Sequence, residues 1–123
     1  MEEKKILVAD DEPHIRLLVS KLLGKDYTVL QANDGAEAVD IARHQRPDLI
    51  LMDLMMPRVD GYVACSAIKT DRATRGIPVV MLTGVGHQLN RRLSEKMGAS
   101  GYITKPFDLK QLLEVIAPLL PTS

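Results

Sequence analysis

Four short apolar segments of this 123-residue sequence each end in polar side chains whose types could do chemistry together. Asp10 and Asp11 end the first segment, Asp53 ends the next, and Thr83 and Lys105 end the last two. If these segments are parallel strands of one sheet, their carboxyl ends meet at one edge, which is where ligands of such sheets bind. Three carboxylates, a hydroxyl and an ammonium group would then share one crevice.

Such a crevice is suited to metal-assisted phosphoryl transfer. Close carboxylates repel one another unless they take up protons or a cation, and oxygen ligands with few protein donors are typical of Mg²⁺. A carboxylate beside that ion can act as a nucleophile toward phosphorus and form an aspartyl phosphate. The transferring group needs donors for its outer oxygens, which Lys105 and Thr83 would supply.

Each of these residues also has an ordinary structural explanation when it is considered alone. Asp10, Asp11 and Glu12 could cap a helix, because acidic side chains favour helix N-termini. Lys105 alone would be a solvated charge. Capping does not explain Asp53, which ends a buried run before a loop, and the combination at four segment ends favours the chemical interpretation.

Apolar runs alternate with amphipathic segments along the whole chain. We expect strands at residues 6–9, 27–32, 49–52, 78–82 and 102–104. We expect helices at residues 12–23, 34–44, 61–69 and 88–97, and a last helix from residue 108. The strands are continuously apolar, so both of their faces are buried and the sheet is parallel. Right-handed crossovers then give a doubly wound α/β domain.

Local signals mark where several of these helices begin and end. Pro13 suits a first helical turn, and Gly24 is placed to end the same helix. Asp34 followed by Glu37 predicts a capping box, and Asp108 predicts an N-cap for the last helix.

Composition limits the functions that this chain can have. The length fits one domain over residues 1–123, with a core at about 4–120. Aromatic residues are only 3% of the chain, so the core is expected to be aliphatic. Sixteen basic and sixteen acidic residues balance, which suggests neither a nucleic-acid nor a membrane surface. The single cysteine, Cys65, suits buried packing in a reducing compartment, and we expect a cytoplasmic protein.

At this point the sequence resembles the receiver domains of bacterial two-component response regulators, over about residues 4–120. The segments that carry the resemblance are residues 8–12 (VADDE), 51–57 (LMDLMMP) with Asp60 and Gly61, 81–84 (MLTG) and 101–107 (GYITKPF). Each segment alone is a weak signal, but the four together in this order are specific. The resemblance implies a flavodoxin-like five-stranded parallel sheet of order 2-1-3-4-5, with helices on both faces.

The resemblance also implies roles for the residues at the crevice. Asp53 would be the phosphoacceptor, and Lys105 would pair first with its carboxylate and then with the phosphate. Asp11 would bind Mg²⁺ directly, Asp10 would bind it mostly through a metal-bound water, and the backbone carbonyl of Met55 would complete the protein ligands.

The family pattern further implies a conformational switch. Thr83 would move toward the phosphate, and Tyr102 would turn inward behind it. Gly84 would leave the phosphate pocket unobstructed. The bond between Lys105 and Pro106 would be a cis peptide.

The function implied is a signalling switch rather than an enzyme. A histidine kinase or a phosphotransfer protein would donate the phosphoryl group, and a downstream protein target would read the state at the surface of the domain. The chain would catalyse only its own phosphorylation and dephosphorylation. In this family, receivers attached to winged-helix DNA-binding domains often carry an acidic pair before the tyrosine of the fifth strand, and this pair forms salt bridges across a dimer. Ser100 and Gly101 stand there instead, so we expect a monomer or a weak dimer.

Two other functions remain open from the sequence. A phosphatase of the haloacid-dehalogenase type also uses an aspartate at a strand end. Such enzymes usually carry a second acid two residues later, and here that position is Met55. An inert receiver-like scaffold is the other alternative, and the presence of all five crevice residues argues against it.

Overall fold

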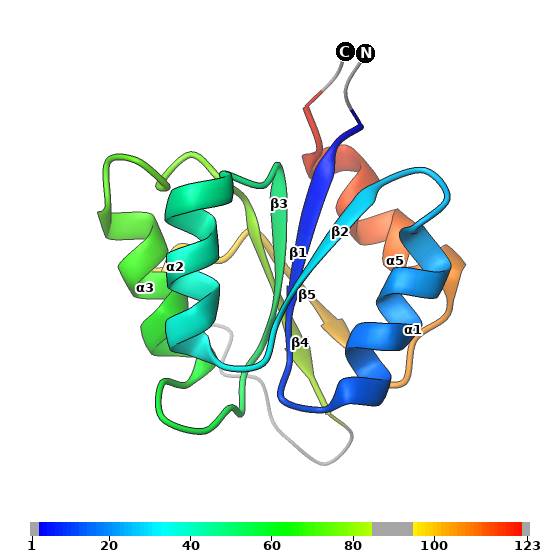
Figure 1. Ribbon diagram of the computed structural model, residues 1–123, viewed down its shortest axis with the longest axis horizontal. Helices are drawn as coiled ribbons and strands as arrows, with labels where there is room; N and C mark the ends of the chain where they lie inside the picture. Colours follow the sequence, from blue (N-terminus) through cyan, green and yellow to red (C-terminus); the bar gives the residue numbers. More distant parts are fainter. Residues whose placement is uncertain (1–2, 85–94, 122–123) are drawn as a thin grey trace.

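The computed structural model describes residues 3–84 and 95–121 of the chain. Its five strands are β1 (Lys5–Ala9), β2 (Thr28–Ala32), β3 (Leu49–Asp53), β4 (Val79–Thr83) and β5 (Gly101–Thr104). All neighbouring strands pair in parallel, in the order β2-β1-β3-β4-β5 (Figure 1). The doubly wound sheet and the strand order that we expected are therefore confirmed.

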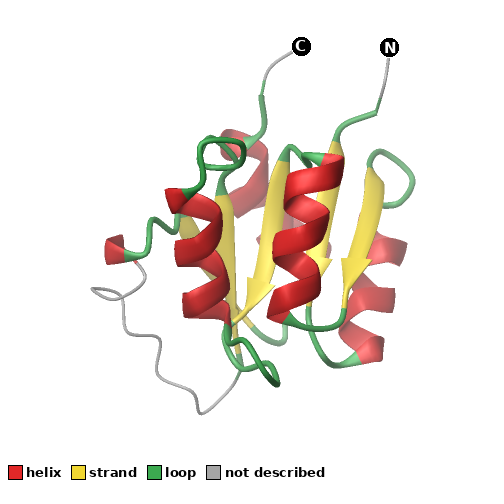
Figure 2. Cartoon of the chain, turned by 60° about the vertical axis from the view of Figure 1, so that its left-hand side comes forward, coloured by secondary structure: helices red, strands yellow, loops and turns green. Residues whose placement is uncertain are grey.

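Helices cover both faces of this sheet, as Figures 1 and 2 show. The described helices are α1 (Pro13–Leu23), α2 (Gly35–Gln45), α3 (Gly61–Thr70), α5 (Leu109–Ile116) and the short 3-10 helix η1 (Ala117–Leu119). The helix expected at 88–97 lies mostly in residues 85–94, outside the described residues. Within the described parts, no helix combines the length and the apolar character that crossing a membrane requires.

The core consists of two aliphatic layers, one on each face of the sheet. Successive strand side chains point to opposite faces, so Leu7 packs in the layer of α2 and α3 while Ile6 and Val8 pack in the layer of α1 and α5. Every residue of β3 and β4 is buried. Cys65 lies fully buried in the layer of α3, which confirms its packing role. This burial on both faces holds the carboxyl ends of β3 and β4 rigidly beside each other.

The predicted start of the last helix is confirmed, since Asp108 caps α5 in a reciprocal capping box with Gln111. The box predicted for α2 is only half formed. The Asp34 side chain accepts a hydrogen bond from the Glu37 amide, but the Glu37 carboxylate accepts from the amide of Asn33. Because the Glu37 amide uses only one oxygen of the Asp34 carboxylate, the other oxygen is available to another donor.

The first helix begins and ends where the sequence predicts, although its end has an unexpected geometry. Pro13 occupies its first turn, and the amide of Gly24 closes it by donating to the carbonyl of Ser20. Gly24 has a φ of −63°, so it ends the helix in the right-handed region rather than in the left-handed one that favours glycine.

Candidate functional site

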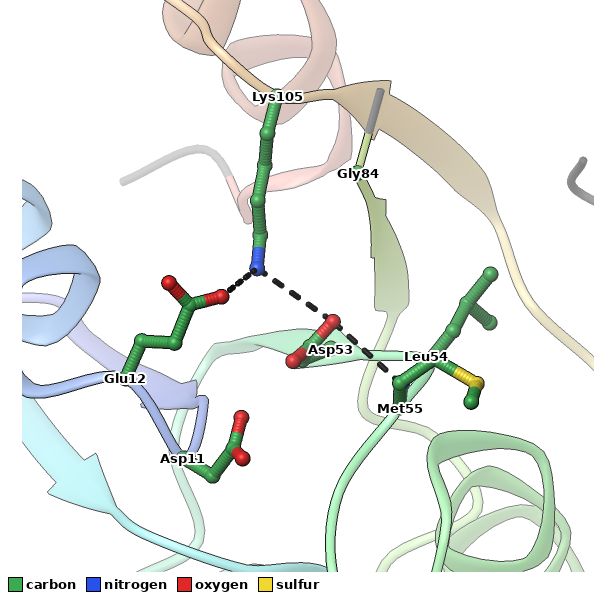
Figure 3. A pocket seen from close by; sticks show the side chains of 7 residues that line it. All are labelled: Asp11, Glu12, Asp53, Leu54, Met55, Gly84 and Lys105. Atoms are coloured by element: carbon green, nitrogen blue, oxygen red, sulfur yellow. Dashed lines mark hydrogen bonds and ion pairs between the residues drawn. The ribbon is translucent and has the colours of Figure 1, made fainter. Parts of the chain in front are cut away.

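A cleft of about 350 Å³ opens at the carboxyl edge of the sheet. It is lined by Asp11, Glu12, Asp53, Leu54, Met55, Gly84 and Lys105 (Figure 3). Strand register explains this convergence, because Ala9 pairs with Met52 and the residues that follow them, Asp10 and Asp53, reach the same level. The cleft therefore lies at the edge of the sheet where the sequence predicts the reactive residues to meet.

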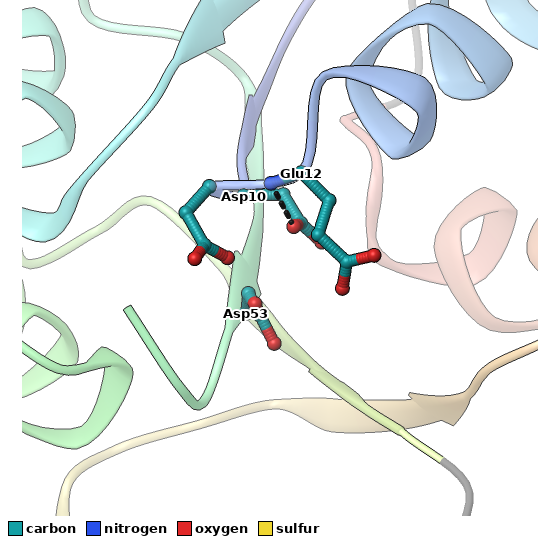
Figure 4. Close-up of side chains that lie close together, drawn as sticks. Asp10, Glu12 and Asp53 are labelled. Atoms are coloured by element: carbon teal, nitrogen blue, oxygen red, sulfur yellow. Dashed lines mark hydrogen bonds between the residues drawn. The ribbon is translucent and has the colours of Figure 1, made fainter. Parts of the chain in front are cut away.

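Four carboxylates gather in and under this cleft, from Asp10, Asp11, Glu12 and Asp53. Each offers an oxygen, and these oxygens lie within 4.8 Å of one another. Figure 4 shows Asp10, Glu12 and Asp53 approaching from the ends of β1 and β3. Asp10 and Asp53 are buried whereas Asp11 and Glu12 are exposed, so the cluster has a dry floor and an open rim. Such clustering of negative charge favours a bound cation.

Asp10 is the most enclosed member of the cluster, with no exposed surface. Its Oδ1 accepts a hydrogen bond from the Glu12 amide at 2.9 Å, and its Oδ2 lies 2.7 Å from Lys105 Nζ. The Arg16 guanidinium on α1 donates to its backbone carbonyl at 2.7 Å. These contacts fix Asp10 in one orientation beneath the cleft.

Lys105 reaches into the cluster from the end of β5, and its backbone amide donates to the Thr83 carbonyl at 2.6 Å. Its Nζ lies 2.7 Å from Asp10, 3.4 Å from Asp53 and 3.7 Å from Glu12. The sequence interpretation pairs Lys105 with Asp53, whereas the shortest of these distances is to Asp10. The peptide bond that joins Lys105 to the next residue, Pro106, is cis.

The neighbours of Lys105 set its charge. Burial, the largest single influence, would lower the pKa of the Lys105 ammonium, but the hydrogen bond and charge of Asp10 oppose it. The charges of Asp53 and Glu12 act in the same direction, and the pKa is raised overall. Lys105 therefore stays cationic and is available to anionic groups in the cleft.

Asp53 occupies the end of β3 and is 5% exposed. Burial, followed by repulsion from Asp10, raises the pKa of its carboxyl to about 6, although the Lys105 charge opposes the shift. The amide of Met55 faces Asp53 Oδ1 at 3.5 Å. A nucleophile must be ionised, so positive charge added to this cleft would favour the reactive form of Asp53.

The remaining predicted residues lie beside the cleft rather than within it. Thr83, which is 4% exposed, ends β4 directly before Gly84, which lines the cleft. Tyr102 on β5 pairs with Met81 and is 38% exposed, outside the lining. The cleft thus brings together Asp11, Asp53 and Lys105 above Asp10, with Thr83 at its border.

The sequence interpretation gave Glu12 no role beyond capping. In the structure its carboxylate belongs to the acidic cluster and lies 3.7 Å from Lys105 Nζ. The available signal was its position as the third acid in a row after β1. The N-cap position of α1 does hold Glu12, but its side chain makes no capping hydrogen bond.

Comparison with known proteins gives close structural matches. Chemotaxis protein CheY4 of Vibrio cholerae has a TM-score of 0.90 and 32% identity, covering 97% of this chain and 100% of that chain. The receiver domain of sensor histidine kinase PA1611 from Pseudomonas aeruginosa, solved with magnesium in its active-site cleft, has a TM-score of 0.87 and 31% identity. That match covers 96% of this chain and 98% of the other.

Sequence relatives lead to the same group of proteins. The transcriptional regulator RpaA of Synechocystis is 42% identical over 117 residues, which are 94% of this chain and 48% of that protein. Response regulator PleD of Caulobacter vibrioides is 44% identical over 105 residues, which are 85% of this chain and 23% of that protein. The chain spans half or less of the length of these curated relatives.

Residues 6–117 match the family model of the response regulator receiver domain. With the strand order and the acidic cleft, this match defines a receiver-type α/β switch module. The chain belongs to the response regulator receiver domain family of two-component systems. The comparisons give no support to the phosphatase or the scaffold alternative.

Proposed function

We propose that Asp53 accepts a phosphoryl group in a Mg²⁺-dependent reaction and that a histidine kinase or a phosphotransfer protein is the donor. The observation that carries this proposal is the position of the Asp53 carboxylate. It is buried at the floor of the cleft, among three other acids, and 3.4 Å from the cationic Lys105. The proposed nucleophile, the proposed cation site and the positively charged Lys105 therefore lie together in one cleft.

Acetyl phosphate with Mg²⁺ tests this proposal directly. A switch forms one covalent adduct per chain, which mass spectrometry of the intact protein detects. Continuous release of phosphate without an adduct would indicate a phosphatase, and the absence of any modification would indicate an inert scaffold. Either result would contradict the proposal.

The transfer balances without any further reactant. An Asp53 oxygen forms a bond to phosphorus as the bond from phosphorus to the donor's histidine nitrogen breaks, and that nitrogen keeps the electron pair. Lys105 can turn from the Asp53 carboxylate to the new phosphoryl oxygens, because its ammonium already lies in the cleft. The hydroxyl of Thr83 is proposed as a further donor to these oxygens. Bound Mg²⁺ would supply neutralisation of the charge on the phosphoryl group.

The donor set fits a hard cation. Among the described residues, the close contact of the fully buried Asp10 Oδ2 is the ion pair with Lys105 Nζ at 2.7 Å, which leaves this anionic oxygen with room for one further polar partner on the cleft side. Asp11 lines the cleft from an exposed position. We propose Asp11, Asp53 and the Met55 carbonyl as ligands, with Asp10 acting through a metal-bound water.

Loss of Asp11 is expected to weaken Mg²⁺ binding more than loss of Asp10. Asp11→Asn replaces an exposed carboxylate, the proposed direct ligand, by a neutral amide, whereas Asp10→Asn alters a carboxylate that is already held by Lys105 and the Glu12 amide. We expect at least about a tenfold higher dissociation constant for Asp11→Asn, or about 1.4 kcal/mol. The effect of Asp10→Asn should be smaller in the same NMR-monitored titration. Equal constants for the two variants would show that Asp11 is not the more direct ligand.

We further propose that Thr83 transmits the phosphorylated state to Tyr102. Thr83 is buried at the end of β4, and Tyr102 pairs with Met81 on the neighbouring strand while still partly exposed. We propose that Tyr102 turns inward when Thr83 moves toward the phosphate. The surface proposed to report this change includes residues 86–92, which lie outside the described residues. Ligand binding shifts such an equilibrium only by its differential affinity for the two arrangements.

Thr83→Ala is expected to leave Asp53 reactive but to stop the response of Tyr102. The hydroxyl that would follow the phosphate is removed, whereas the nucleophile and Lys105 are retained. The measurement is the NMR signal of Tyr102 with and without beryllofluoride and Mg²⁺, in both proteins. An equal response in wild type and variant would exclude the Thr83 mechanism.

The partners of the whole protein are a further proposal. We propose that a downstream protein reads the switch and that this chain acts as a monomer or a weak dimer. RpaA is described as DNA-binding, and its length is about twice that of the segment matched here. The sixteen basic and sixteen acidic residues of the present chain balance, so its net charge does not favour such binding. The single buried cysteine supports a reducing compartment such as the cytoplasm.

A further inference from the structure

The loop between β3 and α3 carries Met55 past the cleft and is anchored at its base. The amide of Gly61 donates to the Leu54 carbonyl at 2.9 Å, which closes the loop into a ring. A Cβ atom at Gly61 would overlap the carbonyl oxygen of Asp53, so only glycine permits this close return. The base of the loop is therefore fixed by β3 itself.

The tip of the same loop is anchored to a different element, the N-terminus of α2. The Arg58 guanidinium forms an ion pair with the carboxylate of Asp34, the N-cap residue of α2. Beside this pair, the Val59 backbone packs against Gly35, where a Cβ atom would overlap the Val59 carbonyl oxygen. The tip thus rests on α2 through one charged contact and one backbone contact.

The backbone of Arg58 adopts an uncommon conformation that directs its side chain toward Asp34. Arg58 has a φ of 67°, in the left-handed region that arginine seldom adopts. Its turn is closed by a hydrogen bond from the Val59 amide to the Pro57 carbonyl at 2.8 Å. This conformation aims the Arg58 side chain at Asp34, which lies 24 residues earlier in the chain.

Asp34 is a well-prepared partner for Arg58. It is only 6% exposed, and one of its oxygens caps the Glu37 amide at 2.8 Å, which leaves the other oxygen for Arg58. The Glu37 amide first, and Arg58 second, hold the pKa of its carboxyl below the usual range. The Arg58 side chain is itself 70% exposed. Because the Arg58 end is open to solvent, the contribution of the pair to stability is limited, and the contact also ties the loop tip to α2.

We propose that Arg58 is a positioning residue for the metal site and that it acts through Asp34. By holding the loop tip on α2, the pair fixes the backbone of Met55, whose amide faces Asp53 Oδ1 at 3.5 Å. The inference rests on the proposed function, in which the Met55 carbonyl is a Mg²⁺ ligand. A loop held at both ends offers that carbonyl in place, whereas a loop held only at its base must be ordered when the ion binds.

Five variants, of which the charge-conserving Arg58→Lys is the last, separate this role from its alternatives. Arg58→Asn removes the charge but tolerates the left-handed backbone, and Asp34→Asn keeps an N-cap oxygen for the Glu37 amide. The double variant closes a thermodynamic cycle. Arg46→Asn is a matched control, because Arg46 also has a left-handed backbone, with a φ of 46°, but caps the opposite end of α2.

The readout is the Mg²⁺ dissociation constant of the unphosphorylated protein, measured from amide shifts at constant ionic strength. Each of Arg58→Asn and Asp34→Asn should raise it by about tenfold, at the low end for residues that orient metal ligands. The double variant should be no weaker than either single variant. Arg58→Lys, which keeps the charge, should recover most of the affinity, and Arg46→Asn should match wild type.

Charge alone cannot produce the expected result for Arg58→Asn. Loss of a positive charge would by itself strengthen cation binding, so a weakening must come from the loop. If Arg58→Asn binds Mg²⁺ with wild-type affinity, this inference is wrong but the proposed function is not affected, even if the melting temperature of the variant falls. Additive losses in the double variant would also overturn it. A wild-type protein that binds no Mg²⁺ would instead refute the proposed function together with this inference.

Discussion

Replacement of Asp53 by asparagine is expected to abolish phosphorylation by acetyl phosphate while leaving the fold intact. The amide has the shape of the carboxylate but lacks the anionic oxygen that must attack phosphorus. Asp53 is the buried acid at the end of β3. We therefore expect no other carboxylate to take over as the phosphoacceptor. Intact-protein mass spectrometry after incubation with Mg²⁺ and acetyl phosphate measures the effect.

Asp60→Asn is the matched control for this prediction. Asp60 lies in the loop that follows Asp53, between β3 and α3. It caps α3 by accepting a hydrogen bond from the Val63 amide at 2.9 Å, and asparagine can serve as an equivalent cap. The control should be labelled like wild type. Full labelling of Asp53→Asn at another residue would show that the assignment of the phosphoacceptor is wrong.

The sequence could predict the fold because each local signal agreed with the global arrangement. The continuous apolar runs before Asp53 and Thr83 proved to be β3 and β4, buried on both faces. Local capping chemistry was also readable, as Asp108 and Gln111 show. Gly24 was less readable, because a glycine at a helix end allows a left-handed conformation without requiring it.

The sequence could also predict which residues meet, but not how they pair. Parallel strands bring Asp10, Asp53 and Lys105 to one edge whatever the side-chain details are. Which carboxylate lies nearest to the ammonium depends on rotamers and on burial. Asp10 is the deeper acid and is fixed by the Glu12 amide, so Lys105 lies closest to it.

Contacts between distant loops were beyond the reach of sequence patterns. The pair of Arg58 and Asp34 joins residues in two different strand–helix connections, and neither residue type marks the other. Asp34 was readable as a cap through Glu37, but the use of its second oxygen was not. Glu12 illustrates the same limit, since its approach to Lys105 depends on the direction of the turn after β1.

In the absence of metal, Asp53→Asn is expected to be more stable than wild type at neutral pH. Burial and the charge of Asp10 raise the pKa of Asp53 from 3.8 to about 6, so ionising this group costs more in the folded protein than in the unfolded chain. Between these two pKa values the folded state binds more protons. Its stability therefore falls as the pH rises toward about 6, and the loss is complete above that value.

The pKa shift sets the size of this effect. A change of about 2 units corresponds to at most about 3 kcal/mol, at 1.36 kcal/mol per unit. We expect about 2 kcal/mol in favour of Asp53→Asn at pH 7.5 and a clearly smaller difference at pH 5, because much of the folded wild type then carries the proton. Urea unfolding of both proteins in EDTA at the two pH values measures the difference.

Addition of Mg²⁺ should reverse this order. The ion binds the folded wild type and stabilises it by mass action, whereas Asp53→Asn lacks one of the proposed anionic ligands and gains less. The acidic cluster that destabilises the metal-free protein thus provides the attraction that binds Mg²⁺. A stability difference that stays constant between pH 5 and pH 7.5 would show that Asp53 ionises in the folded protein at its ordinary pKa. If Mg²⁺ stabilised both proteins equally, the Asp53 carboxylate would contribute nothing to holding the ion.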